Sequence, residues 1–130
     1  MNGEQSIELA DGSVIAAREL RVGHSLNCPD GSVKITKLRI DAWQEWFWVT
    51  FNTGVSLFVA GDHRFVDPAG EEIRARELKL QQILLARDSY VYVTKLEFLK
   101  CAGEKVSIEV EEPHTYYVQG ILSHNKFMCP

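Results

Sequence analysis

The sequence predicts an all-β domain, and three observations support that fold class. Apolar and β-branched residues gather in short runs, separated by the Asp-Gly, Pro and Gly residues that are typical of hairpin turns. Helical periodicity is limited to two short stretches. Two blocks of sequence also recur at one constant offset. The chain of 130 residues, 45% of them hydrophobic, is long enough for one domain with its own core.

The apolar runs define the expected strands. In chain order these are residues 7–9, 14–16, 32–40, 47–52, 55–59, 83–86, 90–98, 106–110 and 115–118. Residues 16–22 and 74–80 are the two stretches that favour short helical turns. The turns are expected at Asp11-Gly12, Pro29-Asp30-Gly31, Asn52-Thr53-Gly54 and Asp67-Pro68-Ala69-Gly70, because tight reversals need residues that tolerate a positive φ or fix φ in advance.

Internal similarity indicates a duplication. Residues 15–20 overlay residues 73–78, and residues 33–38 overlay residues 91–96, both at an offset of 58 residues. The alternative is convergence, in which two amphipathic turns are each followed by a strand. One offset for two separated blocks favours duplication. Two copies are too few for a solenoid, so we expect the halves to pack as a pseudo-twofold assembly that brings the chain ends to its centre.

Composition and charge exclude several classes of partner. The 14 basic and 18 acidic side chains give a formal net charge of -4 with no basic cluster, so we expect no nucleic acid partner. We expect no membrane partner either, because no apolar run approaches the ~20 residues that cross a bilayer and no secretory signal opens the chain. Cys28, Cys101 and Cys129 form no CxxC pair, which favours a reducing, cytoplasmic location.

A His-Asn pair near the end of the chain suggests a self-cleavage site. The side-chain amide nitrogen of Asn125 can attack the carbonyl carbon of the same residue and close a succinimide, which breaks the bond to Lys126. Positioned histidines accelerate this reaction by taking a proton from the attacking amide and giving one to the leaving nitrogen. His124 is adjacent to the bond, and His114 would face it if residues 115–124 fold back as strand, turn and strand.

Three segments carry a resemblance to a known family. Residues 106–125 run through an aromatic strand to Ser123-His124-Asn125, residues 59–65 form a loop around His63, and residues 9–23 contain the first Asp-Gly turn. They resemble the C-terminal signature, the central T-x-x-H motif and the opening hairpin of Hint domains, the hedgehog/intein autoprocessing family. The resemblance covers nearly the whole chain and implies a horseshoe-shaped all-β fold with internal pseudo-twofold symmetry.

The resemblance also implies roles for individual residues. In the family, an N-terminal Cys or Ser attacks the preceding carbonyl with help from the T-x-x-H histidine, and asparagine cyclisation follows later. Carried onto this chain, His63 would strain and protonate the upstream bond, and His114 would be the base for the asparagine. His124 would polarise the carbonyl or protonate the leaving amine, and Asn125 would cyclise.

Four positions depart from the family pattern. They are Met1 in place of the nucleophile, Ala60 in place of the T-x-x-H threonine, Ser107 in place of an acidic residue and Lys126 in place of the downstream nucleophile. A methionine thioether has no proton to lose and cannot make an acyl shift. Ser6 offers a nearby hydroxyl, but it directly precedes the first expected strand, residues 7–9. The losses affect the upstream, coupling and ligation steps, so the downstream cleavage residues remain complete.

We therefore expect residues 1–125 to form a single Hint domain, with residues 126–130 as a C-terminal extension. The expected function is single-turnover cleavage at Asn125–Lys126 without splicing, by a monomer whose partners are the flanking segments of a bacterial or phage host polypeptide. The alternative is an inactive Hint fold that serves as a structural or binding module. A zinc site of histidines and cysteines is a third interpretation, but their spacings match no paired-ligand pattern, so we expect no metal and no cofactor.

Overall fold

A computed structural model describes residues 1–125 of the chain, which form two long strands, nine short strands and two single turns of 3₁₀ helix. In chain order the elements are β1 (Ser6–Glu8), β2 (Val14–Ala16), the first 3₁₀ turn (Ala17–Glu19), β3 (Ser25–Cys28), β4 (Gly31–Phe51), β5 (Ser56–Ala60), β6 (Arg64–Val66), β7 (Glu72–Arg74), the second 3₁₀ turn (Ala75–Glu77), β8 (Ile83–Leu85), β9 (Tyr90–Val110), β10 (Thr115–Val118) and β11 (Ile121–His124). The all-β prediction is confirmed.

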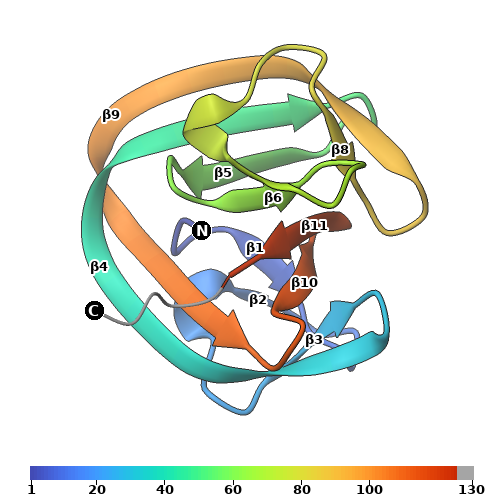
Figure 1. Ribbon diagram of the computed structural model, residues 1–130. Helices are drawn as coiled ribbons and strands as arrows, with labels where there is room; N and C mark the ends of the chain where they lie inside the picture. The colour runs from blue at the N-terminus through green and yellow to red at the C-terminus, as the bar shows by residue number, and fades with distance from the viewer. Residues whose placement is uncertain (126–130) are drawn as a thin grey trace.

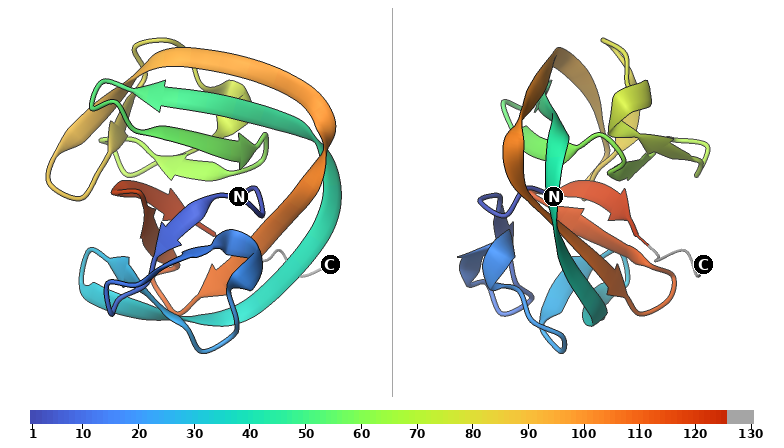
Figure 2. Two further views of the ribbon diagram at one scale, coloured as in Figure 1. Left: turned by 180° about the vertical axis from the view of Figure 1, so that it is seen from behind. Right: turned by 90° about the vertical axis from the view of Figure 1, so that its left-hand side faces the viewer.

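Two long antiparallel strands, β4 and β9, form a curved ribbon around the short strands (Figure 1). Their pairing runs from Ile35↔Val110 to Phe51↔Val93, with register shifts at three points. β3, β5 and β8 attach to this ribbon, while β10, β11, β6 and β7 make a separate four-stranded sheet. The short strands fall into two lobes, one that contains β1–β3 and one that contains β5–β8. The right-hand view in Figure 2 shows that the β4–β9 ribbon twists between the two lobes and links them.

The two lobes repeat the same pairings at the predicted offset. β1 pairs with β2 through Ile7↔Ile15, and β6 pairs with β7 through Phe65↔Ile73, 58 residues later in both strands. β3–β4 and β8–β9 are related in the same way. The predicted pseudo-twofold duplication is therefore confirmed in the strand register.

An ion pair also recurs in both lobes. Arg18 follows β2 and pairs with Glu104 on β9 at 3.4 Å, and Arg76 follows β7 and pairs with Glu45 on β4 at 2.7 Å. Each arginine thus ties its 3₁₀ turn to one of the two long strands.

The core lies between the curved ribbon and the short strands. Side chains that alternate inward along the strands fill it, because successive residues of a strand point to opposite faces. The largest of the fully buried side chains are Trp46, Tyr116, Phe51 and Phe65. Phe51 and Phe65 meet edge to face with ring centroids 6.2 Å apart, which joins the ribbon to the four-stranded sheet.

The strand predictions hold best where apolar runs are bounded by turn residues. The prediction for residues 115–118 matches β10, and the predicted helical turns contain the two 3₁₀ turns. The predicted strands 32–40 and 47–52 are one continuous strand, β4, because pairing with β9 carries the backbone through the polar stretch between them. β3, β6, β7 and β11 were not among the expected strands, although the second strand of a hairpin over residues 115–124 was considered.

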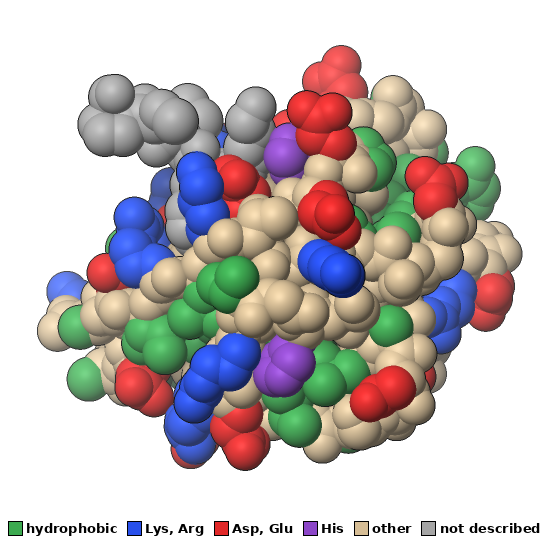
Figure 3. All heavy atoms as spheres, turned by 90° about the horizontal axis from the view of Figure 1, so that it is seen from below, with side chains coloured by type: hydrophobic (Ala, Val, Ile, Leu, Met, Phe, Trp, Pro, Cys, Tyr) green, Lys and Arg blue, Asp and Glu red, His purple; other side chains and the backbone are tan. Residues whose placement is uncertain are grey.

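The surface shows acidic and basic side chains interspersed, with both signs over the face in Figure 3. Among residues 1–125 the helical segments are single 3₁₀ turns, so none has the length or apolar character of a membrane-spanning helix.

Candidate active site

A small cavity at the centre of the fold collects residues from distant parts of the sequence. Its volume is about 50 Å³. The lining residues are Met1, Asp62, His63, Arg64, Lys105, Val106, Ser107, His124 and Asn125. The first residue, the loop after β5, the middle of β9 and the end of β11 therefore meet at one point.

Met1 reaches the cavity because the first residues run antiparallel to β9. The Val106 amide donates a hydrogen bond to the Met1 carbonyl oxygen at 2.8 Å, and the Met1 amino group donates one to the Val106 carbonyl oxygen at 3.0 Å. Burial lowers the pKa of this amino group to about 5; the charge on Asp62 raises it and the charge on Lys105 lowers it. The Met1 backbone therefore lies against the cavity.

His114 is held at the end of β9 by a main-chain contact. Its Nδ1 lies 2.7 Å from the carbonyl oxygen of Val110. Because a carbonyl oxygen only accepts hydrogen bonds, Nδ1 carries the hydrogen, and the neutral ring presents Nε2 as an acceptor. That tautomer is the one a general base needs if Nε2 faces the proton to be removed.

The β10–β11 hairpin brings His114, His124 and Asn125 together. Thr115 pairs with His124, and the turn at Gln119 and Gly120 has positive φ at both residues. The Asn125 amide then donates a hydrogen bond to the His114 carbonyl oxygen at 3.0 Å. The two imidazole rings lie with centroids 6.1 Å apart and planes at 78°. Strand, turn and strand over residues 115–124 is thus the geometry of the structure.

His124 is oriented from the neighbouring strands. Its Nδ1 lies 3.1 Å from Oε1 of Glu72 on β7, although the contact lacks the angles of a hydrogen bond. Burial lowers the pKa of His124, and the nearby His114 and Arg64 also lower it, whereas Glu72 raises it. Glu72 was not among the residues that the sequence pointed to.

His63 lies in the cavity and contacts β11. A hydrogen bond of 2.9 Å joins its Nε2 to the Ser123 hydroxyl, and the ring meets Phe65 edge to face at 4.9 Å between centroids. Burial, followed by the charge of the chain's amino group, holds the pKa of His63 well below its usual value, so the ring is neutral near pH 7. Main-chain pairing fixes the loop, since the Ala75 amide donates to the His63 carbonyl oxygen at 2.8 Å.

The fold is shared with solved inteins. The gp41-1 intein matches with a TM-score of 0.84 and 20% identity over 95% of this chain and 96% of that one. The DnaB intein from Synechocystis sp. PCC 6803 matches with a TM-score of 0.87 and 17% identity over 98% of both chains. The chain has the Hint fold. The bacterial intein-like domain from Clostridium thermocellum matches this Hint domain with a TM-score of 0.80 and 20% identity over 92% and 94% of the two chains. No family model and no curated protein matches the sequence.

The structure shows where the residues that depart from the family pattern lie. Met1 and Ser107 both line the cavity, and Ala60 is buried at the end of β5, just before the loop that carries His63. Ser6 is exposed on β1 and does not line the cavity. Lys126, Cys129 and the rest of residues 126–130 lie outside the described residues.

A half-buried ion pair in the cavity was not identified from the sequence. Lys105 Nζ lies 2.9 Å from Asp62 Oδ2 and 3.7 Å from the centroid of the Trp43 ring, and Lys105 is only 6% exposed. The pair joins β9 to the His63 loop across one wall of the cavity. No local sequence pattern predicts this ion pair, because Lys105 and Asp62 meet only through the pairing of strands that are distant in the sequence.

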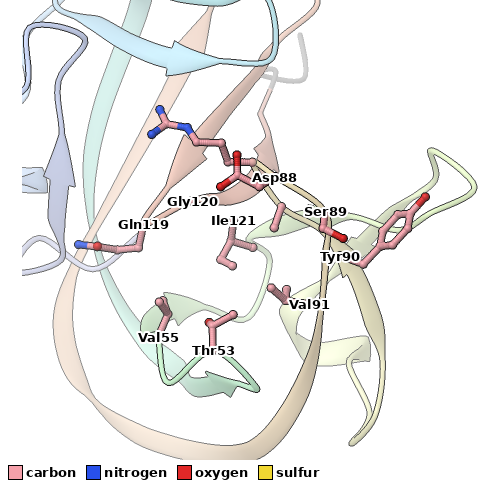
Figure 4. Close-up of a pocket in the computed structure, with 11 residues that line it drawn as sticks. Thr53, Val55, Asp88, Ser89, Tyr90, Val91, Gln119, Gly120 and Ile121 are labelled. Carbon is pink, nitrogen blue, oxygen red and sulfur yellow. The ribbon is translucent and has the colours of Figure 1, made fainter.

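No group of three or more His, Cys, Asp or Glu side chains within residues 1–125 is arranged to hold a metal ion. A second, more open pocket lies at the other end of the β10–β11 hairpin, where Figure 4 shows Val55, Val91 and Ile121 around it. None of the four predicted site residues lines that pocket. Three of the four predicted site residues, His63, His124 and Asn125, line the central cavity, and the centroid of the His114 ring lies 6.1 Å from that of the His124 ring.

Proposed function

We propose that this Hint domain is a self-processing domain whose remaining reaction is cleavage of the Asn125–Lys126 bond by asparagine cyclisation. The observation that carries the proposal is the fixed relation of His114, His124 and Asn125. The centroids of the two imidazole rings are 6.1 Å apart, and the main-chain N–H of Asn125 donates a hydrogen bond to the His114 carbonyl oxygen. Each residue that the reaction needs therefore lies within one hairpin.

The proposed reaction is an internal acyl transfer. The Asn125 side-chain nitrogen attacks the Asn125 carbonyl carbon and loses a proton to Nε2 of His114. The bond from that carbon to the Lys126 nitrogen breaks, and His124 gives a proton to the leaving nitrogen. The products are a chain that ends in a succinimide and a downstream segment with a new amino terminus. Each domain acts once, so this is not a turnover enzyme.

Upstream chemistry is excluded from the proposal because the cavity lacks its nucleophile. Met1, which lines the cavity, carries a thioether that cannot make an acyl shift, and Ala60 has no hydroxyl to hold an upstream carbonyl. Ser107 cannot replace the acidic residue that couples the two ends, since a serine hydroxyl does not ionise near neutral pH. The flanking polypeptide segments of a host are thus the partners of a reaction that cuts without ligating.

The experiment uses the full chain with a folded tag placed after Pro130. Incubation near neutral pH should release the tag, and mass spectrometry should find a fragment that ends at Asn125 as a succinimide or its hydrolysis product. The Asn125→Ala variant is the control and should stay intact. If both proteins remain whole over days, the domain is an inactive Hint fold that serves as a structural or binding module.

A further inference from the structure

Glu72 brings a carboxylate to the back of His124 from a strand distant in the sequence. It lies on β7, which pairs with β6, and β6 pairs with β11. Its Oε1 lies 3.1 Å from His124 Nδ1 and accepts a hydrogen bond of 3.1 Å from the Arg64 guanidinium. Arg64 itself pairs with His124 across β6 and β11, so the three side chains form one cluster.

The Nδ1 atom of His124 is shielded from solvent, and the Glu72 carboxylate is the ion-pair partner that the described residues offer it. The cationic or cation-forming groups around the ring are Arg64 on β6, His114 before β10 and Lys105 on β9. The neutral His63 and the carboxylate of Asp62 also line the cavity, but Asp62 is bonded to Lys105. Glu72 therefore supplies the negative charge that contacts His124 directly.

We propose that Glu72 is a positioning residue that holds His124 as a proton donor, with Nδ1 toward the carboxylate and Nε2 toward the scissile bond. The role rests on the proposed cleavage, in which the leaving nitrogen must receive a proton. A carboxylate against one ring nitrogen fixes the orientation of the ring and stabilises its protonated form.

The electrostatics of the site agree with this role. Burial lowers the pKa of His124 and thereby disfavours the protonated ring, and Glu72 opposes that effect. Without the carboxylate, the pKa of His124 should fall further, since His114 and Arg64 would still repel the added charge. Above the pKa, each unit of decrease reduces the protonated fraction by about tenfold.

The test compares Glu72→Gln with Glu71→Gln. Glutamine keeps the size of the side chain and an oxygen for Arg64, so Glu72→Gln should fold. Glu71 is exposed and bonds Asp67 through its main-chain amide, which makes Glu71→Gln the matched control. NMR titration of His124 in the intact Asn125→Ala background should show a lower pKa for Glu72→Gln and no change for Glu71→Gln.

Cleavage kinetics give the second measurement. With Asn125 present, Glu72→Gln should move the high-pH limb of the rate profile to lower pH and slow cleavage by about tenfold at pH 7 for one unit of pKa change. Glu72→Asp, which keeps the charge, should restore part of the rate. An unshifted His124 titration in folded Glu72→Gln, or an unshifted rate profile, would overturn the inference. Absence of cleavage in the unaltered chain would overturn the proposed function and the role of Glu72 in it. The NMR titration would still decide whether Glu72 affects the pKa of His124.

Discussion

The main-chain N–H of Asn125 donates a hydrogen bond of 3.0 Å to the carbonyl oxygen of His114, across the open end of the β10–β11 hairpin. The bond ties the backbone of the candidate reacting residue to the backbone of its candidate base. The relative position of the two is thus set by main-chain pairing, which side-chain substitutions leave in place. This permits each histidine to be tested without moving the asparagine.

Replacement of either histidine should slow cleavage while leaving the fold intact. We expect His114→Ala and His124→Ala each to reduce the rate of tag release by roughly 10²- to 10⁴-fold, the usual contribution of a positioned acid or base. His24→Ala is the control, because His24 lies in a turn remote from the cavity and its Nδ1 accepts a hydrogen bond from the Arg21 amide. Equal rates for all three variants, measured by gel densitometry, would rule out the assigned roles.

The burial of His63 should make stability depend on pH. Its pKa is lower in the folded chain than the usual value of about 6.5, so below that pH the unfolded chain takes up a proton more readily. The contribution of the neutral His63 ring to the free energy of unfolding is fully present above pH 6.5, and it is lost as the pH falls through the pKa that His63 has in the folded chain. The Met1 amino group acts in the same direction between pH 8 and its folded pKa of about 5.

Urea denaturation at several pH values checks this prediction. Removing the His63 titration with His63→Gln should flatten the curve of unfolding free energy against pH below 6.5 by up to about 1.4 kcal/mol per pH unit. The contribution of Met1 remains in both proteins. Parallel curves for the variant and the unaltered chain would contradict the burial of a neutral ring at this position.

Loss of the Ser123 hydroxyl should destabilise the domain. Ser123 is fully buried and bonds Nε2 of His63, so Ser123→Ala leaves a buried ring nitrogen without its partner. The expected cost is about 1–3 kcal/mol in the free energy of unfolding. Ser32→Ala, at an exposed serine on β4, should change it by less than about 0.5 kcal/mol. The interpretation fails if chemical denaturation gives the two variants the same stability.

The pseudo-twofold axis supplies a matched pair of glycines. An added Cβ at Gly61 would overlap the Glu45 carboxylate, which is held by Arg76, whereas at Gly3 it would lie 3.2 Å from Oε1 of Glu104. We expect Gly61→Ala to cost up to about 1 kcal/mol, because the Glu45 carboxylate must turn away from Arg76 and the partly exposed ion pair is weakened. Gly3→Ala should cost less, as measured by thermal or urea unfolding. A larger loss of unfolding free energy for Gly3→Ala than for Gly61→Ala would contradict the tighter contact at Gly61.

The duplication and the histidine hairpin could be predicted because they depend on local order in the sequence. The turns before each 3₁₀ segment keep their spacing in both halves, and β10 is an aromatic run bounded by Pro113 and Gly120. The continuity of β4 could not be predicted from its own residues. The polar and aromatic stretch between the two predicted strands remains extended only because β9 pairs with it.

The remaining site residues could not be found in the same way. Glu72 contacts His124 only after β7 pairs with β6 and β6 with β11, and Lys105 meets Asp62 only after β9 reaches the loop beyond β5. These contacts depend on strand register between distant segments, which no spacing along the chain encodes. β7 also reads Glu72-Ile73-Arg74, whose single apolar residue between two charged ones forms no apolar run that would indicate a strand.

The β4–β9 ribbon bears on timing during synthesis. Pairings between residues so far apart in the chain form slowly, because the intervening loop must close before any contact rewards it. Val106 and Val110, which anchor Met1 and His114, both belong to β9, and Asn125 follows β11. Asn125 therefore leaves the ribosome after all the other residues of the candidate site. The proposed cleavage must wait for completed assembly of the fold.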